Sequence, residues 1–177
     1  TDDGNLSAAD IVNTYETEEL IRIFRVYGEL PNAKQIALEI MRSRAKAPIE
    51  TTQQFKEILF PLAPKFKDFK FYAQVFQALR IEVNQEIDGL SEMLNACGDV
   101  IKPGGRLVIM SYHSLEDRLV KNYLLKGNIE GNLVKDFYGN DQLLFKVVNR
   151  KPIEATETEI SLNSRARSAK LRVAVKL

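Results

Sequence analysis

Apolar residues recur every three or four positions along the first third of the chain, from about residue 6 to residue 62. One clear example is the set Leu20, Ile21, Phe24 and Tyr27. This spacing puts the apolar side chains on one face of a helix. Ser7 and Thr51 each precede such a run and are typical N-caps, because their hydroxyls accept hydrogen bonds from the free N–H groups of a first turn. The pattern predicts a compact all-helical subdomain built from several short helices.

The same spacing continues from residue 72 to residue 101, which predicts one long helix. Its apolar positions are Tyr72, Phe76, Leu79, Val83, Ile87, Leu90, Leu94, Cys97 and Ile101. At 1.5 Å per residue this helix would be roughly 45 Å long. We expect it to bend or divide at Gly89, since glycine weakens a helix interior. The helix would lead from the helical subdomain into a sheet.

A short apolar run, residues 107–111, follows a Pro-Gly-Gly turn and is predicted to be a strand. Apolar side chains on both faces are typical of a strand in a mostly parallel sheet. Polar side chains, Ser111 and His113, stand at the carboxyl end of this strand. Open α/β sheets bind their ligands at the carboxyl ends of their strands. Ser114 is predicted to cap the next helix, with Asp117 at its third position. A lone histidine at a strand end is also commonly a hydrogen-bonded structural residue, so both roles stay open for His113.

Two further strands are predicted near the C-terminus. Residues 143–148 form the first, and residues 171–175 alternate between apolar and polar side chains, as a half-exposed antiparallel strand does. That alternation places Arg172 on the exposed face. Arg165 and Arg167 precede the last strand on a loop, where forked guanidinium groups suit phosphate. A solvated charged face is the equally open alternative.

Composition limits the function classes. The chain has 177 residues, enough for one core and a smaller satellite, and 45% of them are hydrophobic. One histidine and one cysteine cannot supply the four nitrogen or sulfur ligands of a structural zinc site, so no metal is expected. No run of eighteen apolar residues and no signal segment is present, from which we expect a soluble cytoplasmic protein with no membrane partner. The polar residues 1–5 are typical of a linker within a longer protein.

The net charge of +1 conceals a gradient along the chain. The first thirty or so residues are acidic, whereas the last thirty-five or so are basic. An acidic or nucleic-acid partner is therefore expected to bind the C-terminal part.

Five separated blocks of the sequence closely resemble the ribosomal RNA small subunit methyltransferase H family, in that family's order. The blocks are PGGRLVIMSYHSLEDR at residues 103–118, NSRARSAKLR at 163–172, FQALRIEVN at 76–84, ADIVNTY at 9–15 and PIETT at 48–52. Members of this family use S-adenosylmethionine to methylate the exocyclic N4 of a cytidine in 16S ribosomal RNA. The resemblance implies the same reaction, with 16S rRNA or the small ribosomal subunit as partner.

The resemblance covers the later half of the family pattern. It implies an α/β fold, namely the C-terminal part of a Rossmann-like class I methyltransferase sheet with an all-helical inserted subdomain. We expect residues 1–78 to be the helical substrate-recognition subdomain and residues 79–177 to be the C-terminal part of the methyltransferase domain. The family's glycine-rich donor loop has no counterpart here, so no residue of this chain is expected to bind the cofactor, S-adenosylmethionine, and the chain alone is expected to be inactive. A sheet without its first strands would leave an apolar face uncovered, which favours a homo-oligomer.

The resemblance and the chemistry together select the candidate site residues. The N4 amine of cytosine is a poor nucleophile because its lone pair is delocalised into the ring, so an enzyme needs acceptors that polarise its N–H bonds. The candidate catalytic residues at the strand end are His113, Ser111 and Asp117. The candidate RNA-binding residues are Arg165, Arg167, Lys170 and Arg80.

Two other classes stay open. Without a donor loop, the chain could be a non-catalytic RNA-binding or protein-binding module. A hydrolase that uses Ser111 or Ser114 with His113 is the other possibility, although no Gly-x-Ser-x-Gly elbow is present and no orienting acid is evident. Binding of the methyl donor separates the first class from a methyltransferase, and reaction with a serine-directed phosphonate tests the second.

Overall fold

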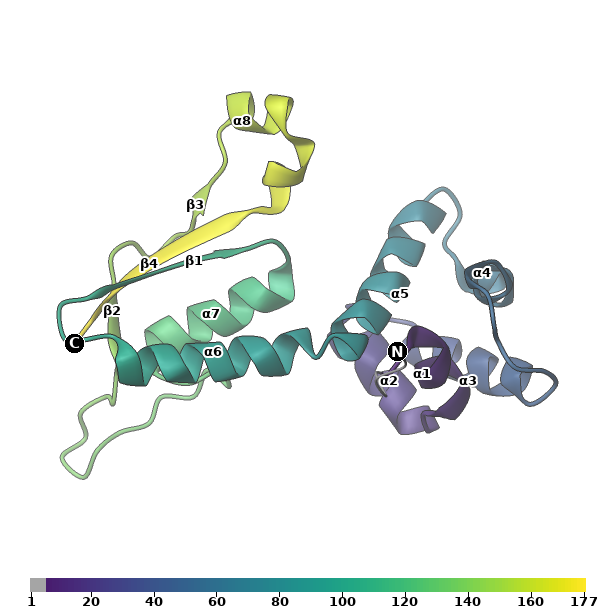
Figure 1. Cartoon of the computed structure of the whole chain (residues 1–177), viewed down its shortest axis with the longest axis horizontal. Coiled ribbons are helices and arrows are strands. Elements are labelled where there is room, and N and C mark those ends of the chain that lie inside the picture. Colours follow the sequence, from purple (N-terminus) through teal and green to yellow (C-terminus); the bar gives the residue numbers. More distant parts are fainter. Residues whose placement is uncertain (1–5) are drawn as a thin grey trace, which may run out of the picture. The chain divides into compact units, whose positions relative to one another are not determined.

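The computed structural model describes residues 6–177 and divides the chain into two compact units, Thr1–Glu86 and Ile87–Leu177 (Figure 1). Each unit has its own apolar core. The boundary predicted between residues 78 and 79 lies inside α5 (Asp68–Val83). Leu79, which follows that boundary, packs with Phe71 and Val75 in the core of the first unit. The linker predicted for residues 1–5 lies outside the described residues.

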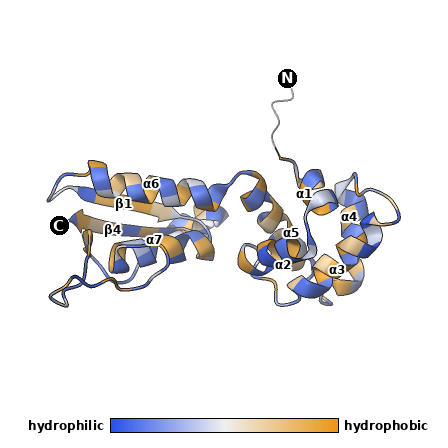
Figure 2. Ribbon diagram, turned by 90° about the horizontal axis from the view of Figure 1, so that it is seen from below, coloured by the Kyte–Doolittle hydropathy of each residue, from blue (hydrophilic) through white to orange (hydrophobic). Residues whose placement is uncertain are grey.

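The first unit is helical throughout its described part, which confirms the helical prediction for residues 6–62. Its elements are α1 (Ala8–Thr14), α2 (Thr17–Val26), α3 (Ala33–Arg44), α4 (Thr52–Leu59), the 3-10 helix η1 (Phe60–Leu62) and α5. Ser7 and Thr51 cap α1 and α4 as expected, and each does so within a capping box. The helices are amphipathic, with polar and apolar faces in Figure 2. Their apolar faces bury a single cluster that includes Leu20, Phe24, Ile36, Ile40, Leu59 and Val75.

The single long helix predicted for residues 72–101 is wrong. The chain forms two helices, α5 and α6 (Glu86–Val100), separated by Asn84 and Gln85. Gln85 has a φ of 49°, in the left-handed region that a right-handed helix does not contain, so the helical ladder stops there. Gly89, the expected breaking point, lies within α6.

The second unit combines helices with a four-stranded sheet, which confirms the α/β class. The long strand β4 (Lys170–Lys176) pairs antiparallel with β1 (Arg106–Ser111), β2 (Phe145–Val147) and β3 (Ile153–Glu154). The mostly parallel sheet expected around residues 107–111 is therefore wrong for the described strands. A Rossmann-like arrangement stays a prediction.

Two helices cover one face of this sheet. Side chains of α6 and α7 (Ser114–Lys126) pack with Leu107, Phe145 and Ala174 in the second core. On the opposite face Val108 and Met110 are 55% and 51% exposed, so β1 is covered on one side and not on both as expected. Association of copies through this open face stays a prediction.

The remaining part of this unit is the short helix α8 (Glu157–Leu162) and the 3-10 helix η2 (Ser164–Ser168), which precede β4. Thr156 caps α8 with its side chain. None of the helices in residues 6–177 is both long and apolar enough to span a bilayer.

Gly98 in α6 permits a close approach to Tyr123 of α7. A Cβ atom at residue 98 would lie 2.5 Å from the Tyr123 hydroxyl oxygen. We therefore predict that Gly98→Ala destabilises the chain by about 1–3 kcal/mol through overpacking, although alanine favours a helix by up to about 1 kcal/mol. Chemical denaturation measures the change. In a Tyr123→Phe background the same substitution should be neutral or stabilising, and an equal loss in both backgrounds would contradict the packing explanation.

Candidate functional site

The candidate site lies where β1 ends and α7 begins. A turn at residues 102–105 leads into the strand, with Gly104 in the left-handed region at a φ of 81°. The turn is fastened to β4, because the N–H of Gly104 donates to the carbonyl of Lys176 and the N–H of Lys176 donates to the carbonyl of Gly105. Six residues of β1 then pair in register with β4, from Arg106 opposite Val175 to Ser111 opposite Lys170. β1 is thus fixed to β4 from the turn that precedes it to Ser111 at its end.

His113 is the N-cap of α7, so the expectation that Ser114 caps this helix is wrong by one residue. The Nδ1 atom of His113 accepts a hydrogen bond from the backbone N–H of Glu116 at 3.4 Å. His113 has the extended conformation of an N-cap, whereas Ser114 is already the first helical residue. The histidine side chain is mostly buried, at 13% exposure. The structural role left open for His113 is therefore present in the fold.

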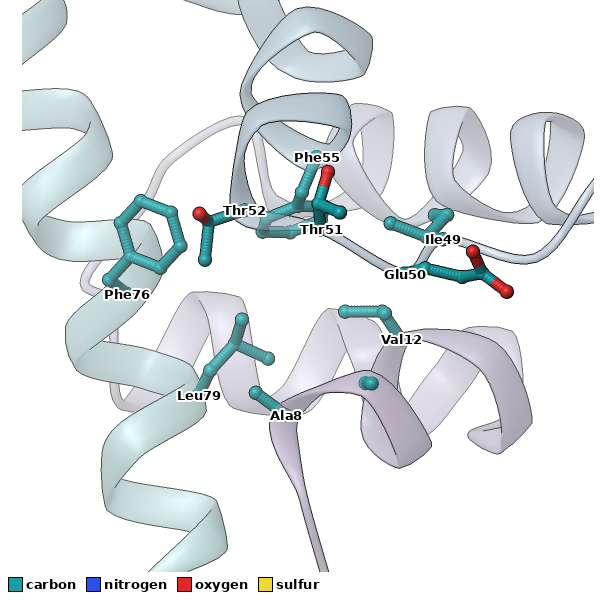
Figure 3. Close-up of a pocket in the computed structure, with 10 residues that line it drawn as sticks. Ala8, Val12, Ile49, Glu50, Thr51, Thr52, Phe55, Phe76 and Leu79 are labelled. Atoms are coloured by element: carbon teal, nitrogen blue, oxygen red, sulfur yellow. The ribbon is translucent and has the colours of Figure 1, made fainter.

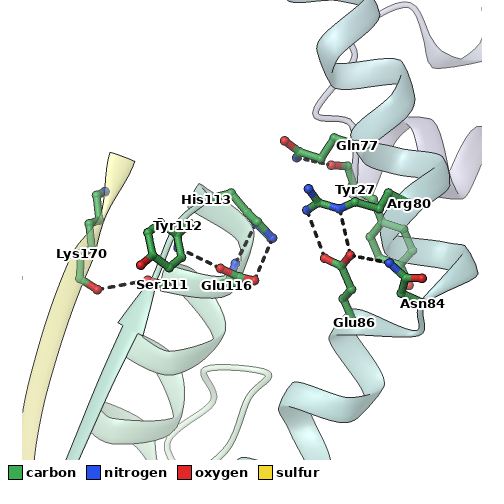
Figure 4. A network of polar contacts seen from close by, with 10 residues as sticks. All are labelled: Tyr27, Gln77, Arg80, Asn84, Glu86, Ser111, Tyr112, His113, Glu116 and Lys170. Carbon is green, nitrogen blue, oxygen red and sulfur yellow. Dashed lines mark hydrogen bonds and ion pairs between the residues drawn. The ribbon is translucent and has the colours of Figure 1, made fainter. Parts of the chain in front are cut away.

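Glu116 holds both residues of the turn. One carboxylate oxygen, Oε1, lies 3.1 Å from Nε2 of His113, and the other accepts from the backbone N–H of Tyr112 at 2.9 Å (Figure 4). Hydrogen bonding with the His113 side chain, the largest influence, and with Tyr112 lowers the pKa of Glu116 against the opposing effect of burial. A charged carboxylate is therefore in contact with the imidazole.

Asp117 does not cap the helix but forms a bidentate ion pair with Arg172 of β4. The Nε and Nη2 atoms of Arg172 donate to the two carboxylate oxygens at 2.7 and 3.0 Å. Lys170 Nζ lies 3.7 Å from the same carboxylate. Burial alone would raise the pKa of Asp117, but the hydrogen bonds and charge of Arg172, with the charges of Lys170 and Lys121, outweigh it and hold this pKa below its ordinary value.

Ser111 is buried and its hydroxyl donates to the backbone carbonyl of Lys170 at 3.4 Å. The nearby imidazole of His113 is engaged with Glu116 instead. Ser111 and His113 therefore do not form the hydrogen bond that a serine hydrolase requires between nucleophile and base. This arrangement disfavours the hydrolase alternative for Ser111.

Three of the four residues expected to bind RNA belong to the second unit. Arg165 and Arg167 lie on η2 and are exposed, and among the described residues neither guanidinium forms an ion pair. Lys170 begins β4, five residues after Arg165. Arg80 lies on α5 in the first unit, where its guanidinium already pairs with Glu86 at 2.9 and 3.2 Å (Figure 4). The RNA role of all four stays a prediction.

A surface hollow of about 640 Å³, including space open to solvent, adjoins the strand end. Met110, Leu171 and Ile153 give it an apolar floor, and Tyr112, Glu154 and Asn163 supply polar groups. This mixture suits a flat, partly polar ligand such as a nucleobase. The hollow lies wholly within the second unit.

The helical unit has a smaller hollow of about 340 Å³ between α1, α4 and α5 (Figure 3). The hollow has apolar walls formed by Phe55, Phe76 and Leu79. At its edge, the hydroxyl of Thr51 caps α4. Glu50 is the one titratable residue among those that line this hollow, so the hollow offers no acid–base pair for catalysis.

Sequence reasoning missed Glu116 and Arg172. Glu116 stands three residues after His113, which is the spacing of a capping box, but the pattern was assigned to Ser114 and Asp117 instead. Arg172 was placed on the exposed face by strand alternation, whereas it is only 8% exposed because Asp117 neutralises it. The alternation correctly separates Arg172 from Leu171 and Val173, but it does not tell which of the two faces the core covers.

Comparison with known proteins identifies close relatives. The family model described as the MraW methylase family matches residues 1–177. A protein of Amoebophilus asiaticus is 56% identical over 169 residues, which are 96% of this chain and 54% of that protein. A protein of Bacteroides fragilis strain YCH46 is 53% identical over 171 residues, which are 97% and 56%, and one of Christiangramia forsetii is 52% identical over 172 residues, which are 97% and 57%. All three are named ribosomal RNA small subunit methyltransferase H, and the chain spans about half their length.

The ion pair of Asp117 gives a prediction for stability against pH. We expect Asp117→Asn to lower the free energy of unfolding at pH 7 by about 3 kcal/mol, because it leaves the buried Arg172 without a counter-ion. The folded-state pKa of Asp117 is depressed. The contribution of Asp117 to the free energy of unfolding is therefore present above about pH 4 and is lost as the pH falls through this folded-state pKa. Denaturation at several pH values should therefore show the two proteins converging in acid. Asp88→Asn, at an exposed position of α6, is the control, and a pH-independent difference would contradict the prediction.

Proposed function

The chain belongs to the MraW methylase family, and from this membership we propose that it forms part of an enzyme that methylates N4 of a cytidine in 16S rRNA with S-adenosylmethionine as donor. The names of the relatives support a ribosomal RNA substrate. The observation that carries the proposal is the sequence identity to the Amoebophilus asiaticus relative, which is 56% over 96% of this chain. Within this proposal the place of action is the cytoplasm, where ribosomal RNA is found in bacteria.

The described residues do not by themselves fit the donor. Nucleotide-type cofactors in open α/β sheets bind at a glycine-rich turn between a parallel strand and a helix. The strand-to-helix turns of residues 6–177, at 112–113 and 155–156, contain no glycine, and the described strands pair antiparallel. We therefore assign donor binding to the part of the full-length relatives that this chain does not match.

The role proposed for this chain is to bind and orient the base. The hollow beside Tyr112 is the proposed place of the cytosine ring. His113 does not line this hollow, so its proposed contact is with a neighbouring part of the substrate, where Glu116 and the helix N-terminus fix the imidazole. Ser111 and Asp117 have their polar atoms engaged with β4, so we propose that they position this turn and do not touch the substrate. Pre-positioning of this kind lowers the entropic part of the barrier for the weakly nucleophilic amine.

A non-catalytic binding module is the alternative that the misfit to the donor leaves open. Calorimetric titration of the chain with S-adenosylmethionine tests the misfit itself, and the chimera described below separates its two explanations. No heat would agree with a donor site elsewhere in the complete enzyme. Saturable binding would show that residues assigned here to the substrate hold the donor.

A chimera tests the proposed activity and the role of His113 together. The matched region of the Bacteroides fragilis relative is replaced by this chain, and tritium transfer from S-adenosylmethionine to 16S rRNA is measured, with the modified nucleoside identified by mass spectrometry. We expect N4-methylcytidine from the chimera. His113→Ser should lower kcat about 100-fold, because it removes the imidazole that positions the base.

Serine is chosen at residue 113 because it is itself a good N-cap and preserves the start of α7. His113→Ala is the companion variant, expected to cost a further 1 kcal/mol or so of stability. Unchanged turnover of His113→Ser with unchanged RNA affinity would return His113 to a purely structural role. Absence of any methyl transfer by the chimera would overturn the proposed function.

The proposed phosphate contacts of η2 and β4 are tested by salt dependence. Replacement of Arg165 and Arg167 by Gln should weaken RNA binding and lower the slope of log affinity against log salt by about 0.7 for each phosphate that the variant no longer binds. Lys102→Gln with Arg106→Gln removes two exposed cations from the other end of β1 and is the matched control. Equal slopes for the wild-type chain and the Arg165 and Arg167 variant would exclude this assignment.

A further inference from the structure

The end of the connection between α4 and α5, together with the first three residues of α5, carries lysine and phenylalanine side chains that the helical core does not use. Residues 65–70 read KFKDFK, and every one of them is exposed. We refer to these six residues as the Lys–Phe segment. Phe66 is 100% exposed and Phe69 is 87% exposed, and Phe60, shortly before the segment, is 70% exposed. Single exposed apolar residues are ordinary, but three exposed phenylalanines within ten consecutive residues, 60–69, indicate a binding surface.

The backbone of Phe66 strengthens this interpretation. Phe66 has a φ of 63°, in the left-handed region that favours glycine. It lies in a turn closed by a hydrogen bond from the N–H of Lys67 to the carbonyl of Pro64 at 3.0 Å. Glycine or asparagine is the usual residue at such a position. The ring of Phe66 is thus kept at a backbone cost, although it makes no contribution to the core, and strain of this kind gathers at functional sites.

The charges define the kind of ligand. Lys65, Lys67 and Lys70 stand beside the two rings, with Asp68 as the one acidic residue of the segment. Among the described residues none of the three lysines forms an ion pair. Proteins bind single-stranded nucleic acid with cations placed along its phosphate backbone and with aromatic rings between them, on which the bases stack. Recognition of an anionic membrane surface takes a larger cluster, of about four to eight basic residues.

We propose that the Lys–Phe segment binds single-stranded RNA, with bases stacked on Phe66 and Phe69 and phosphates paired with Lys65, Lys67 and Lys70. This inference rests on the proposed function, which makes the substrate an RNA, and it adds a contact surface in the helical unit that none of Arg165, Arg167, Lys170 and Arg80 provides. The segment recognises unpaired bases, since stacked bases of a duplex cannot lie on the rings.

The test is fluorescence anisotropy of the chain with a labelled oligouridine of about 12 nucleotides, within the range of common site sizes. Phe66→Gly combined with Phe69→Ala should weaken binding about tenfold or more, with an unchanged salt slope. Glycine suits the backbone of residue 66, so thermal stability should stay the same or rise and a loss of affinity cannot come from unfolding. Replacement of the three lysines by Ser should instead lower the slope by about 2, from about 0.7 for each phosphate.

Two matched controls and a duplex make the result specific. Phe137 and Tyr138 are 97% and 85% exposed but stand between Asp136 and Asp141, so their replacement by Ala should leave affinity unchanged. A triple Ser variant of Arg25, Lys34 and Lys46 removes three exposed cations from the same helical unit and should not change the slope. With an RNA duplex of the same length, the phenylalanine variant should bind as the wild-type chain does.

Several outcomes would overturn the inference. Wild-type affinity of the phenylalanine variant for oligouridine excludes stacking, and an equal loss in the Phe137 and Tyr138 variant shows that any exposed ring has the same effect. Binding to phosphatidylserine vesicles that disappears with Phe66→Gly, without a change in RNA binding, would assign the segment to a membrane. Methyl transfer by the chimera together with wild-type RNA affinity of the phenylalanine variant refutes this inference alone, whereas specific loss of RNA affinity without methyl transfer refutes only the proposed activity.

Discussion

The buried ion pair between Asp117 and Arg172 is the interaction on which the candidate site depends. It joins the first turn of α7 to the central strand of the sheet, while the β1–β4 ladder holds the preceding residues from the other side. Two charges removed from water stabilise a fold only when their geometry is good and their remaining hydrogen bonds are satisfied. Here the pairing is bidentate, and Lys170 adds a second cation beside the same carboxylate. The turn that carries Tyr112 and His113 is therefore confined between two fixed points.

Much of the helical unit could be predicted from sequence because its signals are local. Ser7 and Thr51 cap the helices they precede, and the apolar periodicity of residues 6–62 matches the faces that are buried. The long helix failed for a reason that periodicity cannot see. Apolar spacing runs through residues 84 and 85 without a gap, whereas the left-handed backbone of Gln85 ends the ladder there. The spacing of side chains reports which face of a helix is buried and says nothing of the backbone dihedral angles between one helix and the next.

The sheet and the site depended on long-range partners, and sequence reasoning did less well there. Residues 107–111 have apolar side chains on both faces, yet only the face toward α6 and α7 is covered among the described residues. Arg172 was expected in solvent because nothing adjacent to it in sequence reveals Asp117, which is far away along the chain. The start of α7 was misjudged by one residue because histidine is a less usual cap than the serine beside it. In each case a contact between distant segments decided what a local rule left open.

The cap formed by His113 has a consequence for the chemistry available at this position. An imidazole nitrogen that accepts a hydrogen bond does so with its lone pair, and Nδ1 gives this lone pair to the backbone of Glu116. The neutral ring must then be the tautomer that carries its hydrogen on Nε2. One nitrogen of His113 therefore belongs to the fold, and the other, Nε2, is buried and lies 3.1 Å from the Glu116 carboxylate. The start of this helix therefore fixes both the tautomer of the neutral ring and the side on which its second nitrogen lies.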